Sequence, residues 1–423
     1  MREQILQFIW QHQYFNTRDL QTADGEPLRI LSPGRLNRHQ GPDFLDAGIR
    51  LGNTLWAGNV ELHVAASDWD RHTHGEDRHY RNVILHVVWE EPSPEEKAAL
   101  HIPLLVLQHR VPKLLLNKYE EWMRCSAFVA CERQLPLVEE AVWSHWKKEL
   151  LERRLRQRSK VIAAALQETR QHWEAVTWWQ MARNFGLPAN TAAFEAMAKS
   201  LPITLLARYT HQPQALEALL LGQAGLLEGT FREDHPRSLQ QLFGHLRIKH
   251  RLSPTHTPVL FLRMRPRNFP TIRLSQLAAL LARTHSWFTM AKEATGLSEF
   301  KKNLSAEASA WWNDHYTWEK RSPEKVKRIG TAMIDSLLIN TFIPLLYAYG
   351  LLRNERSFQD KALSWLQELR AEKNTRVAGW TNLGVHSRNA GDSQALLELK
   401  NSYCDTKKCL QCAVGRTILK KTL

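Results

Sequence analysis

Residues 41–64 read GPDFLDAGIRLGNTLWAGNVELHV, and this stretch contains two apolar runs joined by Gly52-Asn53. A short Gly-Asn link between runs of this kind predicts a β-hairpin. Three polar side chains are unexpected in a plain hairpin: Asp43 opens the first strand, and Glu61 and His63 lie on the second. Because alternate residues of a strand share a face, Glu61 and His63 are expected to project together, near Asp43.

The sequence around the hairpin predicts an α+β domain over residues 1–135. The apolar spacing within residues 5–9 predicts an amphipathic first helix. PLRILSPG (27–34) predicts a short strand, and the continuous apolar run NVILHVVWEE (82–91) predicts a buried strand. The order is a helix, three strands, a polar connection and a further strand, so we expect a mixed sheet with flanking helices.

The pattern changes at about residue 136. From residue 136 to 395, apolar residues recur at helical spacing, which predicts a larger all-α domain with one long helix over 325–350. VLFLRM (259–264) is an exception that looks strand-like. Residues 396–423 hold three of the five cysteines, and we expect this Cys-rich segment to dock back on the N-terminal half.

The composition predicts a folded, basic protein. Hydrophobic residues make up 43% of the chain and charged residues 24%, which excludes an intrinsically disordered chain. No apolar run reaches about 18–20 residues, no signal peptide is evident and the cysteines do not resemble a secreted disulfide framework, so we expect a cytoplasmic protein with no membrane span. The formal charge of +14 favours a polyanion partner, nucleic acid ahead of an anionic membrane.

The three polar groups of the hairpin suggest a metal site. Two carboxylates a few ångströms apart repel each other unless a cation lies between them. Mg²⁺ or Mn²⁺ suits oxygen ligands of this kind and can polarise a phosphate, while His63 can orient a water or take its proton. The alternative is structural: Asp43 is a turn residue after Gly-Pro, and Glu61 is an exposed strand residue.

Asp43 on one strand and Glu61-Leu62-His63 on the next resemble the motif of the PD-(D/E)XK nucleases, over roughly residues 1–95. The resemblance implies a restriction-endonuclease-like mixed sheet. It also implies that Asp43, Glu61 and the Leu62 carbonyl hold the metal. His63 stands where the family has a Lys that assists the nucleophilic water, and this departure puts the rate and the metal preference in question.

The chain as a whole resembles an uncharacterised bacterial family of unknown function, DUF2851. This resemblance implies no established activity. It extends over nearly the full length and is carried by GPDF (41–44), NVELH (59–63), SDW (67–69), NVILHVVW (82–89), LRMRPRNFP (262–270) and CLQCAVG (409–415).

A His-rich stretch follows the hairpin. Imidazoles and carboxylates in this composition suit a transition metal, or contacts to a scissile phosphate or a base. The alternatives are a solvated polar loop and, for His86, a buried core histidine. The second-tier site residues are Asp68, His72, Asp77 and His86.

Cys404, Cys409 and Cys412 form a C-x4-C-x2-C pattern that reads as a set of metal ligands. A closed site normally has four ligands, so Cys125 or Cys131 is expected as the fourth, with a His as a fallback. Either zinc or an iron–sulfur cluster fits. The layout resembles that of some PD-(D/E)XK nucleases with an iron–sulfur cluster. The alternative is a group of incidental buried thiols.

Two basic stretches of the helical half are candidates for contact with nucleic acid. Arg153 and Arg154 lie on a long predicted helix, and Arg263, Arg265 and Arg267 lie in the LRMRPRNFP segment. The alternatives are a solvated helix face and an Arg network that braces helix ends.

These observations together predict a metal-dependent phosphodiesterase that acts on DNA or RNA. Two alternatives stay open: a non-catalytic nucleic-acid-binding protein on a degenerate nuclease scaffold, and a basic helical module for protein interaction. The sequence has no Walker P-loop, Rossmann glycine fingerprint or G-x-S-x-G elbow, which argues against ATPases, dehydrogenases and hydrolases of those kinds.

Overall fold

The computed structural model describes residues 3–37, 39–71, 78–99, 102–262 and 264–421. The chain forms two compact units. Unit 1 comprises Met1–Trp146, Asn382–Gly384 and Glu398–Leu423, and unit 2 comprises Lys147–Thr381 and Val385–Leu397.

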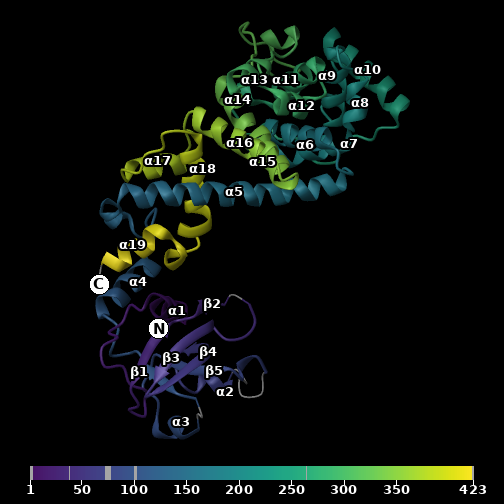
Figure 1. Cartoon of the computed structure of the whole chain (residues 1–423). Coiled ribbons are helices and arrows are strands. Elements are labelled where there is room, and N and C mark those ends of the chain that lie inside the picture. The colour runs from purple at the N-terminus through teal and green to yellow at the C-terminus, as the bar shows by residue number, and fades with distance from the viewer. Residues whose placement is uncertain (1–2, 38, 72–77, 100–101, 263, 422–423) are drawn as a thin grey trace. The chain divides into compact units, whose positions relative to one another are not determined.

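Within its described residues, unit 1 contains one six-stranded mixed sheet with strand order β1-β3-β4-β5-β6, and β2 pairs with β3 (Figure 1). Strands β1, β3 and β4 pair antiparallel, whereas β4–β5 and β5–β6 pair parallel. The strands are β1 (Leu28–Ser32), β2 (Arg35–Leu36), β3 (Phe44–Leu51), β4 (Thr54–His63), β5 (Val83–Val88) and β6 (Leu104–Val106).

The predicted hairpin is confirmed as β3 and β4. Leu51 pairs with Thr54, which leaves Gly52 and Asn53 as a two-residue turn, and Gly52 has a φ of +54°. Glycine takes this left-handed conformation without a steric penalty, which is why the turn forms here. The predicted strand over NVILHVVW is confirmed as β5, whose residues are all buried, as expected for a strand with parallel neighbours.

The helical elements of unit 1 come from both its N-terminal and its C-terminal segments. Helix α1 (Glu3–His12) buries Ile5, Leu6, Phe8, Ile9 and Trp10, and it contacts β4. The other helical elements are α2 (Asp68–Arg71), η1 (Arg78–Tyr80), α3 (Pro94–Ala99), α4 (Lys113–Arg124), η2 (Glu132–Leu137), η6 (Lys400–Cys404), η7 (Cys409–Gln411) and α19 (Ala413–Lys421).

Unit 2 is helical, and its core is a large cluster of buried apolar and aromatic residues. Helices α5 (Glu140–Glu168), α17 (Thr375–Asn382) and α18 (Ala390–Leu399) contribute residues to both units. The elements that lie within unit 2 are α6 (Trp173–Phe185), α7 (Thr191–Ser200), α8 (Ile203–Ala207), α9 (Pro213–Gln223), α10 (Asp234–His250), η3 (Pro266–Asn268), α11 (Pro270–Arg283), α12 (Trp287–Glu293), α13 (Leu297–Asn303), η4 (Ala310–Asp314), α14 (Thr331–Leu337), η5 (Leu338–Phe342), α15 (Ile343–Leu352) and α16 (Arg356–Glu368).

The predicted fold class is confirmed: a mixed-sheet region is followed by a largely helical region. Two local predictions are wrong. The described residues of VLFLRM, 259–262 and 264, form no strand, because no strand of the described chain pairs with them. Leu262 is 82% exposed. The helix expected over 325–350 begins only at Thr331, because Arg328 forms an isolated β-bridge with Glu307.

The stretch Thr331–Leu352 bears on the expectation that the chain has no membrane span. Among the described helices, this one is long and apolar enough to cross a membrane by length and composition. However, 67% of its most apolar window is buried inside the fold. That burial is typical of the core helix of a globular unit, since a spanning helix needs an apolar surface that faces lipid.

Candidate functional site

Asp43 and Glu61 meet where β3 begins and β4 ends. The Asp43 backbone N–H donates to Glu61 Oε2 at 2.9 Å, and the Leu62 backbone N–H donates to Asp43 Oδ2 at 3.2 Å. This exchange follows from the register, in which Phe44 pairs with Val60. Glu61 is only 6% exposed, so the alternative of an exposed strand residue is wrong. The hairpin therefore brings two carboxyl groups together in a largely buried place.

Helix α1 adds two polar residues that sequence reasoning missed. Gln7 Nε2 donates to Asp43 Oδ1 at 2.7 Å, and the charge of Glu3 acts on both Asp43 and Glu61. Glu3 and Gln7 are four residues apart and so share one helix face. The available signal was this polar pair on a helix whose other residues are mostly apolar.

The surroundings of the two carboxyl groups disfavour their ionised forms and raise both pKa values. Burial raises the pKa of Asp43, although the Leu62 N–H and the Gln7 amide oppose the shift. The pKa of Glu61 is raised by burial first and then by the charge of Asp43. A cation beside the pair would favour both ionised forms, because an opposite charge within about 4–6 Å lowers a carboxyl pKa.

His63 lies in the interior and does not face solvent. Its Nδ1 is 2.9 Å from Nε2 of His86 on the neighbouring strand β5, and its Nε2 is 3.5 Å from Glu61 Oε1. The exposed fractions of His63 and His86 are 2% and 0%. Trp69 covers the pair, with its ring centroid 5.1 Å from that of His86. His63 is therefore placed to orient Glu61.

The second-tier residues divide into two groups. Asp68 is buried at the start of α2, and its Oδ2 accepts the Ala65 N–H at 3.2 Å, which is a capping role. His86 contacts His63, as above. His72 and Asp77 lie outside the described residues.

The donor set fits a hard divalent cation. Two carboxylates offer the oxygen ligands that Mg²⁺ and Mn²⁺ prefer, and Mg²⁺ commonly takes one or two carboxylates and keeps several waters. Within the described part of the chain, no three His, Cys, Asp or Glu side chains already surround a common point. A site here would thus consist of Asp43 and Glu61, completed by water and substrate.

A comparison with known families identifies the chain. A family model described as protein of unknown function (DUF2851) matches residues 3–375. The chain belongs to the DUF2851 family. No curated protein and no solved structure gives a match. The resemblance to PD-(D/E)XK nucleases gains no support from these comparisons.

The five cysteines of this DUF2851 protein are all in unit 1 and are all reduced. Cys409 and Cys412 are buried, and Cys125, Cys131 and Cys404 are partly buried. Burial raises the pKa of Cys131, and the thiols of Cys412, Cys409 and Cys125 raise it further. Segments more than 270 residues apart in sequence therefore bring their thiols together.

The predicted phosphate-binding arginines are in different surroundings. Arg153, Arg265 and Arg267 are exposed, whereas the Arg154 Nε donates to Gln394 Oε1 at 2.6 Å within unit 2. The guanidinium of Arg154 thus braces α5 against α18. Arg263 lies outside the described residues.

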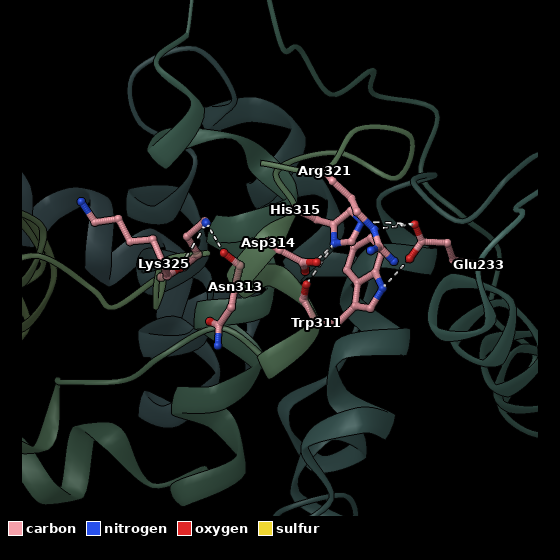
Figure 2. A network of polar contacts seen from close by, with 8 residues as sticks. Glu233, Trp311, Asn313, Asp314, His315, Arg321 and Lys325 are labelled. Carbon is pink, nitrogen blue, oxygen red and sulfur yellow. Dashed lines mark hydrogen bonds and ion pairs between the residues drawn. The ribbon is translucent and has the colours of Figure 1, made fainter. Parts of the chain in front are cut away.

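Unit 2 contains a polar network that sequence reasoning missed (Figure 2). His315 is buried, with Nδ1 2.8 Å from Asp314 Oδ1 and Nε2 3.2 Å from Glu233 Oε1. Its ring stacks on Trp311 at 3.9 Å, and the Trp311 indole N–H donates to Glu233 Oε2 at 3.1 Å. Glu233 is about eighty residues away in sequence, so no local pattern predicts this contact. The network fixes the η4 segment to the start of α10.

Proposed function

We propose that this DUF2851 protein is a metal-dependent phosphodiesterase that hydrolyses DNA or RNA. The observation that carries the proposal is the pair of largely buried carboxyl groups, Asp43 and Glu61. Glu61 accepts the Asp43 backbone N–H and Asp43 accepts the Leu62 backbone N–H across the β3–β4 hairpin. Burying two carboxylates in contact is costly, and a bound cation would offset that cost.

Hydrolysis adds the oxygen of water to phosphorus and breaks the bond to the leaving oxygen, which takes a proton. A bound Mg²⁺ or Mn²⁺ would supply Lewis acidity and lower the pKa of a bound water. Asp43 and Glu61 would hold the cation, and the Leu62 N–H and the Gln7 amide fix the orientation of Asp43. His63 orients Glu61 from one side and is itself fixed by His86.

Further support comes from the order of elements and from charge. A helix, antiparallel strands, a connection and a parallel strand β5 follow one another in the order that the PD-(D/E)XK resemblance implies. The formal charge of +14 and the exposed Arg265 and Arg267 favour a polyanionic substrate.

A second candidate is a nucleic-acid-binding protein without catalytic activity. The observation that favours it is the environment of His63, which is 2% exposed and bonded to His86. A lysine at this position would carry a positive charge toward the attacking water, whereas the His63 imidazole contacts Glu61.

The deciding experiment is a cleavage assay on the purified full chain with Mg²⁺ or Mn²⁺. Substrates are single- and double-stranded DNA and RNA. Asp43→Asn and Glu61→Gln are compared with Asp46→Asn, a matched control on the same strand. Asp46 is exposed and pairs with Arg35, and asparagine tolerates its φ of +59°.

The proposal predicts cleavage by the wild type and by Asp46→Asn, with a loss of at least about 100-fold in the two site variants, since the metal ligands act directly on the reaction. Salt-sensitive binding without cleavage would favour the second candidate. Cleavage that survives both site substitutions would refute the assignment of the site.

A further inference from the structure

Unit 1 gathers the cysteines through contacts between its N-terminal and C-terminal parts. Helix α19 packs against η2, which begins directly after Cys131, and against α4, which ends directly before Cys125. The Lys407 ammonium donates to the backbone carbonyls of Trp122 and Cys125. These contacts hold the Cys404–Cys412 segment beside the chain that carries Cys131.

Four of the five thiols form a mutually interacting set. Cys131, Cys404, Cys409 and Cys412 each lie within electrostatic reach of the other three, and all six pairs interact. Cys125 acts on the thiol of Cys131, and it is not among the groups that act on the thiols of Cys404, Cys409 and Cys412. The structure thus separates the two candidates for a fourth ligand that the spacing left open, and it selects Cys131.

Burial raises the pKa of all four thiols, so charged sulfurs here need cations beside them. Lys400 acts on Cys404, Lys407 on Cys409 and Arg416 on Cys412, so three cations lie beside three of the sulfurs. Cys412 also precedes α19, and the backbone N–H groups of Val414 and Gly415 point at its sulfur. A helix N-terminus stabilises a thiolate in this position.

Trp146 also acts on one of these sulfurs and indicates that a charged sulfur belongs here. The Trp146 side chain is buried, and among the described residues its indole N–H has no hydrogen-bond partner within normal bonding distance. The group that it faces is the Cys412 thiol. A buried N–H without an acceptor costs about 1–3 kcal/mol, and a metal-bound thiolate is a better acceptor than a neutral thiol.

We propose that Cys131, Cys404, Cys409 and Cys412 are the ligands of a thiolate-bound metal centre, with Cys125 excluded from it. This inference is independent of the proposed nuclease activity. It concerns soft metals, because four thiolates select zinc or an iron–sulfur cluster over Mg²⁺.

The spacing favours an iron–sulfur cluster over a single zinc ion. A zinc ion bonds each sulfur at about 2.3 Å, so its four thiolates must nearly touch. Within the described chain, no group of three or more His, Cys, Asp or Glu side chains is arranged to hold a single metal ion. In a cluster each thiolate binds a different iron, so the sulfurs stay further apart.

The first test measures the metal content of the full chain, purified without oxygen, and compares five single Cys→Ser variants. The wild type is expected to retain iron and acid-labile sulfide with visible absorption. Serine at 131, 404, 409 or 412 should lower the metal content by at least half, and Cys125→Ser should leave it unchanged. An equal loss in Cys125→Ser would overturn the choice of ligands, and zinc without iron would overturn the cluster.

A second test needs no variant that risks misfolding. Wild-type protein is treated with iodoacetamide under native conditions, before and after metal removal, and peptides are identified by mass spectrometry. Cys125 alone should react at first, and the other four should react only after removal. Reaction of all five from the start, or disulfides among them, would contradict a metal centre. Trp146→Phe keeps every ligand, and it should shift the reduction potential or the absorption of the centre if the indole N–H bonds to Cys412.

Discussion

Replacing Asp43 with asparagine should stabilise unit 1 in the absence of metal and should abolish its stabilisation by Mn²⁺. The side chains are nearly isosteric, and the new amide oxygen can still accept the Leu62 N–H. The Gln7 amide needs only to turn over, so that its oxygen faces the new NH₂ group.

The expected size follows from charge. At an effective dielectric of about 20, two carboxylates 4–6 Å apart repel by roughly 3–4 kcal/mol. Glu61 relieves part of this repulsion by taking up a proton, since burial and then the charge of Asp43 raise its pKa. One weakened hydrogen bond costs about 1 kcal/mol. The net gain in the free energy of unfolding at pH 8 should be about 1–2 kcal/mol.

The assay is urea unfolding at pH 8, once with EDTA and once with Mn²⁺, for the wild type, Asp43→Asn and the control Asp46→Asn. Mn²⁺ should stabilise the wild type and the control, and by mass action a hundredfold excess over Kd gives about 2.7 kcal/mol. If Asp43→Asn destabilised the metal-free protein, or if it kept the full response to Mn²⁺, the reasoning about a strained carboxyl pair that holds a cation would be refuted.

Three further predictions concern other parts of the chain. If nucleic acid binds unit 2, Arg265→Ala and Arg267→Ala should each weaken binding and reduce the salt slope by about one without loss of stability, whereas Arg154→Ala should destabilise unit 2; filter binding at several salt concentrations and urea unfolding measure this. Gly415→Ala should destabilise unit 1 by at least about 2 kcal/mol, because its Cβ would lie 2.3 Å from the Cys409 carbonyl oxygen, whereas Gly244→Ala in helix α10, where nothing lies within 4 Å, should stabilise by about 0.5–1 kcal/mol. Burial lowers the pKa of His235, so below about pH 6.5 the unfolded chain binds more protons than the folded chain, and stability decreases as the pH is lowered. Urea unfolding at several pH values should show that His235→Gln flattens this slope by up to about 1.4 kcal/mol per pH unit.

Local patterns in the sequence were sufficient to predict the hairpin and the neighbouring strand. The two-residue turn requires a residue such as Gly52 that tolerates a positive φ, and the all-apolar β5 requires parallel neighbours. Alternation along β4 placed Glu61 and His63 on one face, which the structure shows through their 3.5 Å contact.

Contacts between distant segments could not be predicted in this way. Gln7 reaches Asp43 because α1 packs on the sheet, and nothing in the local sequence of either residue specifies the other. The same holds for Glu233 and His315 in unit 2. The prediction of a strand over VLFLRM was wrong for a related reason. Alternation predicts a strand only where a partner strand is available, and no strand pairs with the described residues of this segment.

Unit 1 is assembled from segments that lie far apart in the chain, and this has a consequence for synthesis on the ribosome. Its two main parts are separated by about 250 residues, from Trp146 to Glu398, whereas unit 2 is nearly continuous. About 300 residues separate the end of the sheet at Val106 from the start of α19 at Ala413, so at 5–20 residues per second roughly 15–60 s pass between their emergence. Unit 2 should therefore finish folding before unit 1, although most of unit 1 is synthesised first. During that interval the sheet and Cys131 await their partners, and a chaperone or an oxidant has its best opportunity to act.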